Sequence, residues 1–133
     1  MAFQFSTAAR NASLDAIETT IGASPTLDLR SGVAPATCAT ADSGTLLASM
    51  ALPADFMAAA SGGAKTILGT WQDLSADAAG TVGHFRVKQG ATCHIQGSVT
   101  ITGGGGDMTI DNPVLALAQQ VTVTAFTINA GGA

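Results

Sequence analysis

The chain has 133 residues, a net charge of −4 and a pI near 4.6; 47% of its residues are hydrophobic and only 11% are charged. This length fits one domain over residues 1–133, and the apolar content excludes the disordered class. The acidic balance argues against nucleic-acid binding, which needs clustered Lys and Arg. No apolar run reaches the ~20 residues of a membrane helix, and we expect no secretory signal peptide because no basic segment precedes an apolar one.

The first predicted element is a helix over residues 7–21. Ser6 or Thr7 can cap its N-terminus, and Gly22 stands at the usual stop position. Three apolar residues recur at the spacing of one helical face: Leu14, Ile17 and Ile21. Three polar residues occupy another side: Asn11, Asp15 and Glu18. We therefore expect the helix to lie with its apolar face on a sheet or on a partner.

After Pro25 the apolar pattern changes from helical spacing to alternation, which predicts short strands. The first three predicted strands cover residues 27–30, 46–52 and 65–71. The segment 31–44 is rich in Ala, Thr, Gly, Pro and Ser and is typical of a long loop. We expect one or two helical turns over 54–60 and a second loop over 72–80.

An antiparallel hairpin is the clearest β signal, with strands over 81–88 and 92–102 joined by Gln89-Gly90-Ala91. The glycine tract at 103–106 is then expected to be a flexible hairpin tip. Three further short strands are predicted, over 108–110, 114–117 and 121–129. In the last of them the apolar face switches from Val121 and Val123 to Phe126 and Ile128, which indicates a bulge near Ala125 or burial on both faces.

Seven or eight short strands at even spacing are typical of a mainly β protein, an antiparallel β-sandwich or barrel. We prefer a jelly-roll-like topology, although the pattern alone does not separate it from an immunoglobulin-like sandwich. Residues 1–24 would form an N-terminal arm and helix, and residues 25–133 the β-sandwich.

The hairpin carries a candidate partner-binding surface. Phe85 and Val87 point to one side of the first strand, whereas the other side carries His84, Arg86 and Lys88. On the second strand, His94 is expected on the same outward side, opposite Arg86. The pattern predicts a small basic ridge on an otherwise acidic domain, suited to an acidic patch on a partner. An ordinary solvated sheet face explains the same pattern.

The segment Phe3–Arg10 is a second candidate surface. Phe3 and Phe5 alternate ahead of the helix, as in an extended strand, and Arg10 adds a positive charge. Such an arm can add a strand to a neighbouring molecule. It can equally fold back on its own sheet.

Two cysteines and two histidines offer little catalytic or metal chemistry. Cys38 and Cys93 either form a disulfide or remain two small, half-buried thiols. No spacing of Cys, His or Asp is typical of a zinc or calcium site, and no nucleophile has an adjacent base. We expect no metal, no cofactor and no catalysis.

Alanine, threonine and glycine supply 59 residues. Strand faces built from such small side chains are flat, and their burial at a contact costs little rotamer entropy. The composition therefore suits a packing surface, although a GC-rich genome would produce the same bias.

Several segments of the sequence resemble small virion structural proteins of tailed bacteriophages. These segments are residues 8–17, 69–73, 80–87, 92–97 and 107–112, and the resemblance extends over nearly the whole chain. The resemblance implies a capsid cement (decoration) protein with a jelly-roll-like body. Such a protein would be made in the host bacterial cytoplasm and would bind the major capsid protein on the outer surface of the virion, as a homo-oligomer (dimer or trimer).

The resemblance implies no active site, and it leaves a second hypothesis about the function open. A tail, baseplate or receptor-binding component would use the loop end of the β-sandwich to bind a host glycan. Sugar-binding platforms commonly use Trp or Tyr, and Trp71 is the only such residue in the chain.

Overall fold

The N-terminal helix forms where the sequence predicts it. The computed structural model describes residues 3–132, so Met1 and Ala2 of the predicted arm lie outside the described residues. Helix α1 spans Thr7–Ile21. The side chain of Ser6 accepts a hydrogen bond from the Ala9 amide (3.1 Å), which identifies Ser6 as the N-cap. At the other end Gly22 has a φ of 87° and donates its amide to the Glu18 carbonyl.

Within the described residues, nine strands follow the helix in a mainly β fold. Their bounds are β1 Thr26–Ser31, β2 Leu46–Ala51, β3 Ala64–Thr66, β4 Gln72–Asp73, β5 Gly80–Gln89, β6 Thr92–Ile101, β7 Met108–Ile110, β8 Val114–Leu115 and β9 Val121–Asn129. They form one sheet in the order β2-β1-β5-β6-β7-β9-β3, with β4 paired to β9 and β8 paired to β5. The predicted hairpin is confirmed as β5–β6.

The sheet is mixed, so the prediction of a purely antiparallel arrangement is wrong. Strands β6 and β7 pair in parallel, with Val99 opposite Met108. The glycine tract between them is therefore a tight return loop and not a hairpin tip. A Cβ atom on Gly104 or Gly106 would lie 2.7 or 2.9 Å from Thr100, so only glycine lets the chain double back this closely.

Of three other local predictions, two are corrected by the structure and one is confirmed. Residues 54–60 are not helical, because Phe56 and Met57 are buried and Met57 forms a bridge with Ile67. The loop predicted over 72–80 contains the short strand β4. The predicted bulge in β9 is confirmed: Thr109 lies opposite Ala125 while Ile110 lies opposite Val123, which leaves Thr124 as the extra residue.

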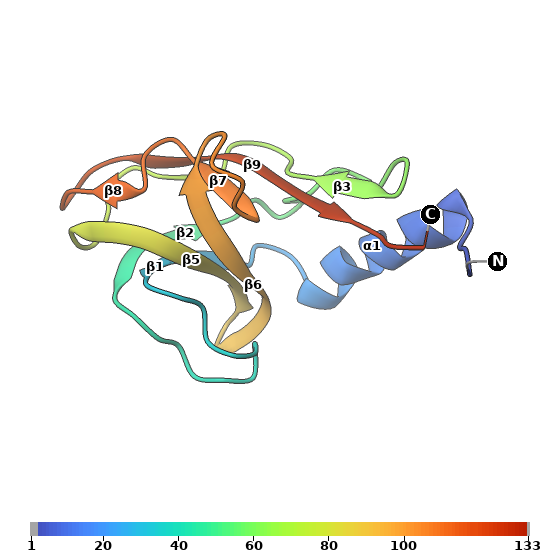
Figure 1. Cartoon of the computed structure of the whole chain (residues 1–133), viewed down its shortest axis with the longest axis horizontal. Coiled ribbons are helices and arrows are strands. Elements are labelled where there is room, and N and C mark those ends of the chain that lie inside the picture. The colour runs from blue at the N-terminus through green and yellow to red at the C-terminus, as the bar shows by residue number, and fades with distance from the viewer. Residues whose placement is uncertain (1–2, 133) are drawn as a thin grey trace.

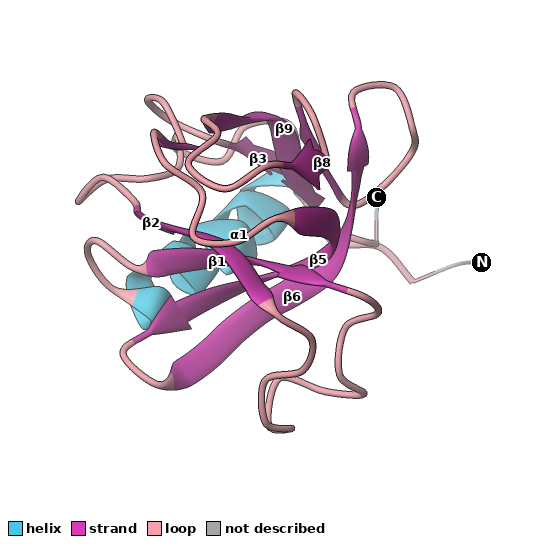
Figure 2. Cartoon of the chain, turned by 90° about the vertical axis from the view of Figure 1, so that its left-hand side faces the viewer, coloured by secondary structure: helices cyan, strands magenta, loops and turns pink. Residues whose placement is uncertain are grey.

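The core lies inside the curl of the sheet. In Figures 1 and 2, β9 and β3 lie above β1, β5 and β6, and α1 extends to one end of the molecule. Phe85 of β5 meets Phe126 of β9 edge-to-face, with ring centroids 5.2 Å apart. Trp71 packs between Phe126 and Phe56. Buried aliphatic side chains of β1, β2 and β7 complete one continuous cluster.

A pair of leucine substitutions tests this assignment of the core. Leu27 is fully buried in β1, whereas Leu117 is 68% exposed. We expect Leu27→Ala to lower the free energy of unfolding by about 2–5 kcal/mol, because it leaves a cavity. Leu117→Ala should change it by less than about 0.5 kcal/mol. Urea unfolding followed by circular dichroism measures both, and equal effects would contradict the packing described here.

Candidate partner-binding surfaces

The basic ridge predicted on the hairpin is not an exposed surface. His84 and Arg86 are 0% and 1% exposed, so their predicted exposure is wrong, and Lys88 is partly buried. The predicted alternation along β5 is confirmed, since Phe85 and Val87 enter the core on the opposite side. What alternation could not show is that a second segment of chain covers the outward side.

That segment is residues 32–44, which we call the strap; it joins β1 to β2. The Arg86 guanidinium reaches three of its groups. It donates to the Asp42 carboxylate (2.6 Å) and to the carbonyls of Cys38 (2.8 Å) and Thr40 (3.0 Å). Because the strap consists mainly of small residues, its backbone carbonyls can approach the guanidinium closely.

Asp42 is shared by three cations. Besides Arg86, its carboxylate pairs with Lys88 (2.7 Å) and with Arg30 (3.3 Å). The hydrogen bond from Lys88, supported by the charges of Arg30 and Arg86, holds the pKa of the Asp42 carboxyl below its usual value despite partial burial. Asp28 of β1 lies 3.8 Å from Lys88 and 3.9 Å from Arg30, which adds a second carboxylate to the cluster.

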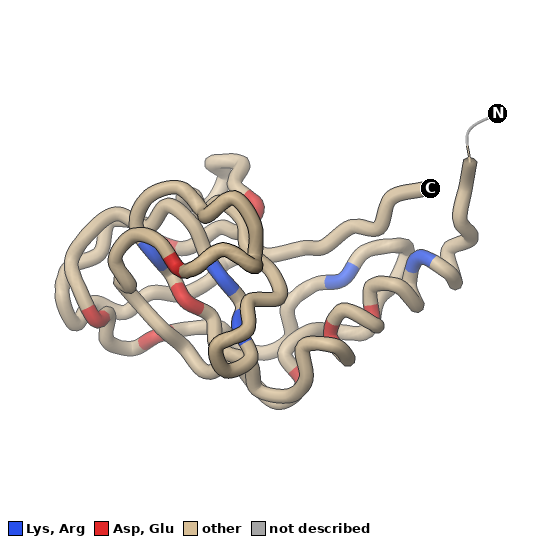
Figure 3. The backbone as a smooth tube through the Cα atoms, turned by 90° about the horizontal axis from the view of Figure 1, so that it is seen from below, with Lys and Arg blue, Asp and Glu red and all other residues tan. Residues whose placement is uncertain are grey.

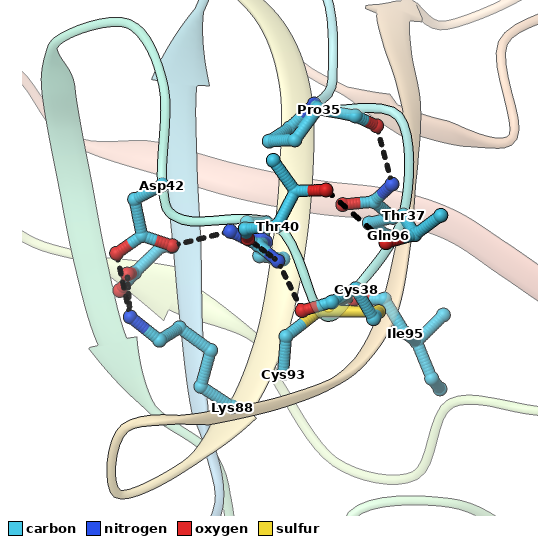
Figure 4. The surroundings of a disulfide bond; sticks show 11 residues. Pro35, Thr37, Cys38, Thr40, Asp42, Lys88, Cys93, Ile95 and Gln96 are labelled. Atoms are coloured by element: carbon cyan, nitrogen blue, oxygen red, sulfur yellow. Dashed lines mark hydrogen bonds and ion pairs between the residues drawn. A yellow bond between two sulfur atoms is a disulfide. The ribbon is translucent and has the colours of Figure 1, made fainter.

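A disulfide and two further hydrogen bonds tie the strap to the sheet. Cys38 of the strap and Cys93 of β6 form a disulfide, with Cα atoms 5.2 Å apart. Gln96 donates to the Pro35 carbonyl (2.7 Å), and Nδ1 of His84 lies 2.9 Å from the Gly32 carbonyl. Figure 4 shows the disulfide beside the Asp42–Lys88 pair and the Gln96–Pro35 bond.

His94 lies apart from the other predicted ridge residues. In the register of the hairpin, Gln96 and not His94 lies opposite Arg86, and a bulge between Val87 and Lys88 leaves His94 without a residue directly opposite it. His94 is half-buried and lines a groove next to Ile17 of α1. The structure therefore does not bring the four residues together as one exposed patch.

The N-terminal arm, in contrast, is exposed. Phe3 and Phe5 are 77% and 50% exposed, and their rings meet edge-to-face at 4.8 Å. The arm also contacts its own chain, because the Phe5 amide donates to the Gly132 carbonyl (2.7 Å). Arg10 is partly buried, and it donates to the Gly62 carbonyl (3.2 Å) and has no contact with a carboxylate among the described residues.

An apolar groove continues from the arm. Its first part, about 420 Å³, lies between α1 and the end of β9 and includes Phe5 and Leu14 in its walls. Its second part, about 570 Å³, lies between β6 and β9 and includes Ile95 and Phe126. Ile17 and two residues of β9 line both parts.

Sequence reasoning missed a second buried cation, Lys65 of β3. It is 1% exposed, and its ammonium group contacts Asp15 (2.7 Å) and Glu18 (3.0 Å) of α1 and the Ala58 carbonyl (3.0 Å). Burial opposes the charged form, yet the hydrogen bonds that Lys65 donates to both carboxylates, together with their charges, outweigh it and raise the pKa of Lys65. The hydrogen bond from Lys65 and that from the Ala60 amide lower the pKa of Asp15.

The polar side of α1 therefore packs against β3 and the segment that precedes it. Glu18 also accepts the Met57 amide, and Asn11 accepts the Gly63 amide. Figure 3 shows the basic position of β3 beside the acidic positions of the helix, and the other basic positions of the sheet beside acidic ones. Only the spacing of Asn11, Asp15 and Glu18 along one helical side hinted at this in the sequence.

Comparison of the chain with protein-family models, with curated proteins and with solved structures found no match. Within residues 3–132, no group of three or more His, Cys, Asp or Glu side chains could hold a metal ion. The one helix in that range is not long and apolar enough to cross a membrane.

The ion pairs of Asp42 should make the free energy of unfolding depend on pH. Since the pKa of Asp42 is lowered on folding, its contribution is complete above the unfolded value near 3.9 and disappears as the pH falls below it. We expect Asp42→Asn to lower the free energy of unfolding by about 1–3 kcal/mol at pH 6, and the difference from wild type to shrink at pH 3. Urea unfolding at the two pH values measures this.

Asp55→Asn is the matched control, because Asp55 is exposed and makes no ion pair within the described residues. It should change stability by less than about 0.5 kcal/mol. A difference between Asp42→Asn and wild type that is the same at pH 6 and pH 3 would contradict the assigned role of the carboxylate.

Proposed function

We propose that this protein is a non-catalytic structural component of a tailed-bacteriophage virion, a cement (decoration) protein. It binds the outer surface of the major capsid shell and stabilises it as a small homo-oligomer. In this proposal the curled sheet is the jelly-roll-like sandwich body. The resemblance of residues 80–87 and 107–112 to small virion proteins supports the assignment, as does a mainly β fold with few charges.

The observation that carries the proposal is the exposed aromatic arm. Two Phe side chains of a small acidic protein stand in solvent, next to an apolar groove. Large exposed apolar groups that lie together are typical of interaction sites. The arm therefore contacts a neighbouring subunit or the shell, where burying the two rings contributes about 1.5–3 kcal/mol each.

The ion pairs of the fold favour the arm over the ridge as the proposed docking surface. Arg30, Arg86 and Lys88 are all paired with carboxylates in the same chain. Five other carboxylates make no ion pair within the described residues: Asp55, Asp73, Asp77, Asp107 and Asp111. With the strap closed, the surface offers an apolar contact and negative charge, which fits an apolar or basic strip on the shell.

The tail or receptor-binding alternative is weaker for a specific reason. Trp71 is 1% exposed, and its indole N–H donates to the Phe56 carbonyl. Its ring lies in the core and offers no face on which a sugar could stack. We therefore keep the capsid proposal in preference to a glycan-binding one.

Copy number in the virion distinguishes these two proposals. A shell built by repeated symmetric contacts would carry on the order of several hundred copies of a cement protein, and a tail tip only a handful. Quantitative mass spectrometry of purified virions measures the ratio of this chain to the major capsid protein. A number near six would refute the cement proposal.

The arm is tested by substitution. We expect Phe3→Ser with Phe5→Ser to lower occupancy on the shell at least about tenfold, because each copy loses the burial of two rings. Leu74→Ser, which also removes an exposed apolar side chain, should leave occupancy unchanged. Occupancy is measured by binding purified protein to particles that lack it. Equal binding by both variants would exclude the arm.

A further inference from the structure

The strap is held in a way that makes it easy to open. Residues 32–44 contain no helix or strand, and none of them is buried. Val33, its one large aliphatic residue, is 88% exposed. Apolar packing, which stabilises most closed loops, therefore adds little to this one. Segments with so few buried apolar contacts open at a low free-energy cost.

Polar contacts and one covalent bond hold the strap instead. Arg86 and Lys88 bind its carbonyls and Asp42, and water can satisfy both partners of such contacts when they separate. Closure also leaves Nε of Arg86 and Nε2 of His84 buried without a protein partner among the described residues. The disulfide from Cys38 to Cys93 is the only covalent connection between the middle of the strap and the sheet.

Both sulfur-bearing residues are accessible. Cys38 and Cys93 are half-buried, and Cys38 lines a surface pocket of about 310 Å³ together with Arg86 and Lys88. A small dithiol can therefore approach the bond from the pocket that Cys38 lines. Its two thiols deliver two electrons and two protons, so that Cys38 and Cys93 become free thiols while the dithiol closes into its own disulfide.

We propose that the Cys38–Cys93 disulfide is a redox latch: its reduction opens the strap and exposes a cationic face of Arg30, Arg86 and Lys88 to an acidic protein surface. The opening strap carries Asp42 away from the cluster. Three positive charges then remain beside one carboxylate, Asp28, in place of two. The latch goes beyond the proposed function: the acidic surface is a second partner, whereas the strip of the shell that the arm contacts is apolar or basic.

Chemical modification of arginine tests the latch directly. Phenylglyoxal labelling of the full chain, located by mass spectrometry, is compared between oxidised wild type, wild type in dithiothreitol, and the Cys38→Ser/Cys93→Ser variant. We expect labelling at Arg86 to accelerate about tenfold or more in both forms that lack the disulfide. Labelling at Arg10, which lies outside the strap, should not change. Equal rates at Arg86 in all three samples would overturn the proposal.

A local opening must be separated from global unfolding. Trp71 is buried in the core, far along the chain from the strap, so its fluorescence reports on the core. The latch requires the native emission of Trp71 to persist after reduction. If the emission shifts to that of the urea-unfolded chain, the disulfide stabilises the whole fold and is not a latch.

Binding of an oligoglutamate peptide tests the exposed face without a virion. We expect at least tenfold tighter binding at low salt by the serine double variant than by oxidised wild type, with the gain removed by adding Lys88→Gln. No difference between the two would overturn the proposed face. The latch and the cement proposal fail separately, because redox-dependent binding of the peptide does not depend on copy number in the virion.

Discussion

The side of the sheet that carries Arg86 depends on the burial of one guanidinium group. A buried cation is tolerated when its charge is paired and most of its N–H groups are hydrogen-bonded. Arg86 cannot meet that requirement within its own strand, so it recruits Asp42 and two carbonyls from a segment more than forty positions earlier in the chain. The path of the strap and the position of Cys38 next to Cys93 follow from this recruitment. The recruited Asp42 also accepts a hydrogen bond from Lys88, which is the main cause of its lowered pKa.

Lys65, at the other end of the molecule, is a second buried cation that is paired with carboxylates from a distant segment. Its ammonium group draws Asp15 and Glu18 of the helix onto the sheet, and α1 docks through polar contacts as well as through Leu14 and Ile21. Four of the five basic residues are thus paired with carboxylates inside the fold. A chain with so few cations that uses them internally presents an acidic exterior, and in the proposed function its exposed apolar groups therefore make the contact with the partner.

The sequence predicted what local rules determine. Ser6, Gly22 and the apolar spacing defined the helix to the residue, and the switch of face in β9 located its bulge. It could not predict features that depend on distant segments. Alternation shows that Arg86 and Phe85 lie on opposite sides of a strand, but a covering strap changes an exposed side into a buried one. The parallel pairing of β6 with β7 depends on a return loop whose glycines are also compatible with a hairpin tip.

The correction at Arg86 changes how the positive charge of this protein can function. On an open ridge, Arg86 and Lys88 would attract any acidic surface at all times, and binding would weaken steadily with salt. Under a strap they contribute to folding while it is closed and become available only when it opens. The same cations can stabilise the fold and bind a partner because Asp42 lies on the strap and Asp28 on the sheet. Opening of the strap removes one carboxylate and leaves the cations in place. The arm needs no such change, since Phe3 and Phe5 are already exposed. Together the two proposals give one small domain two contact surfaces, one available at all times and one only after reduction.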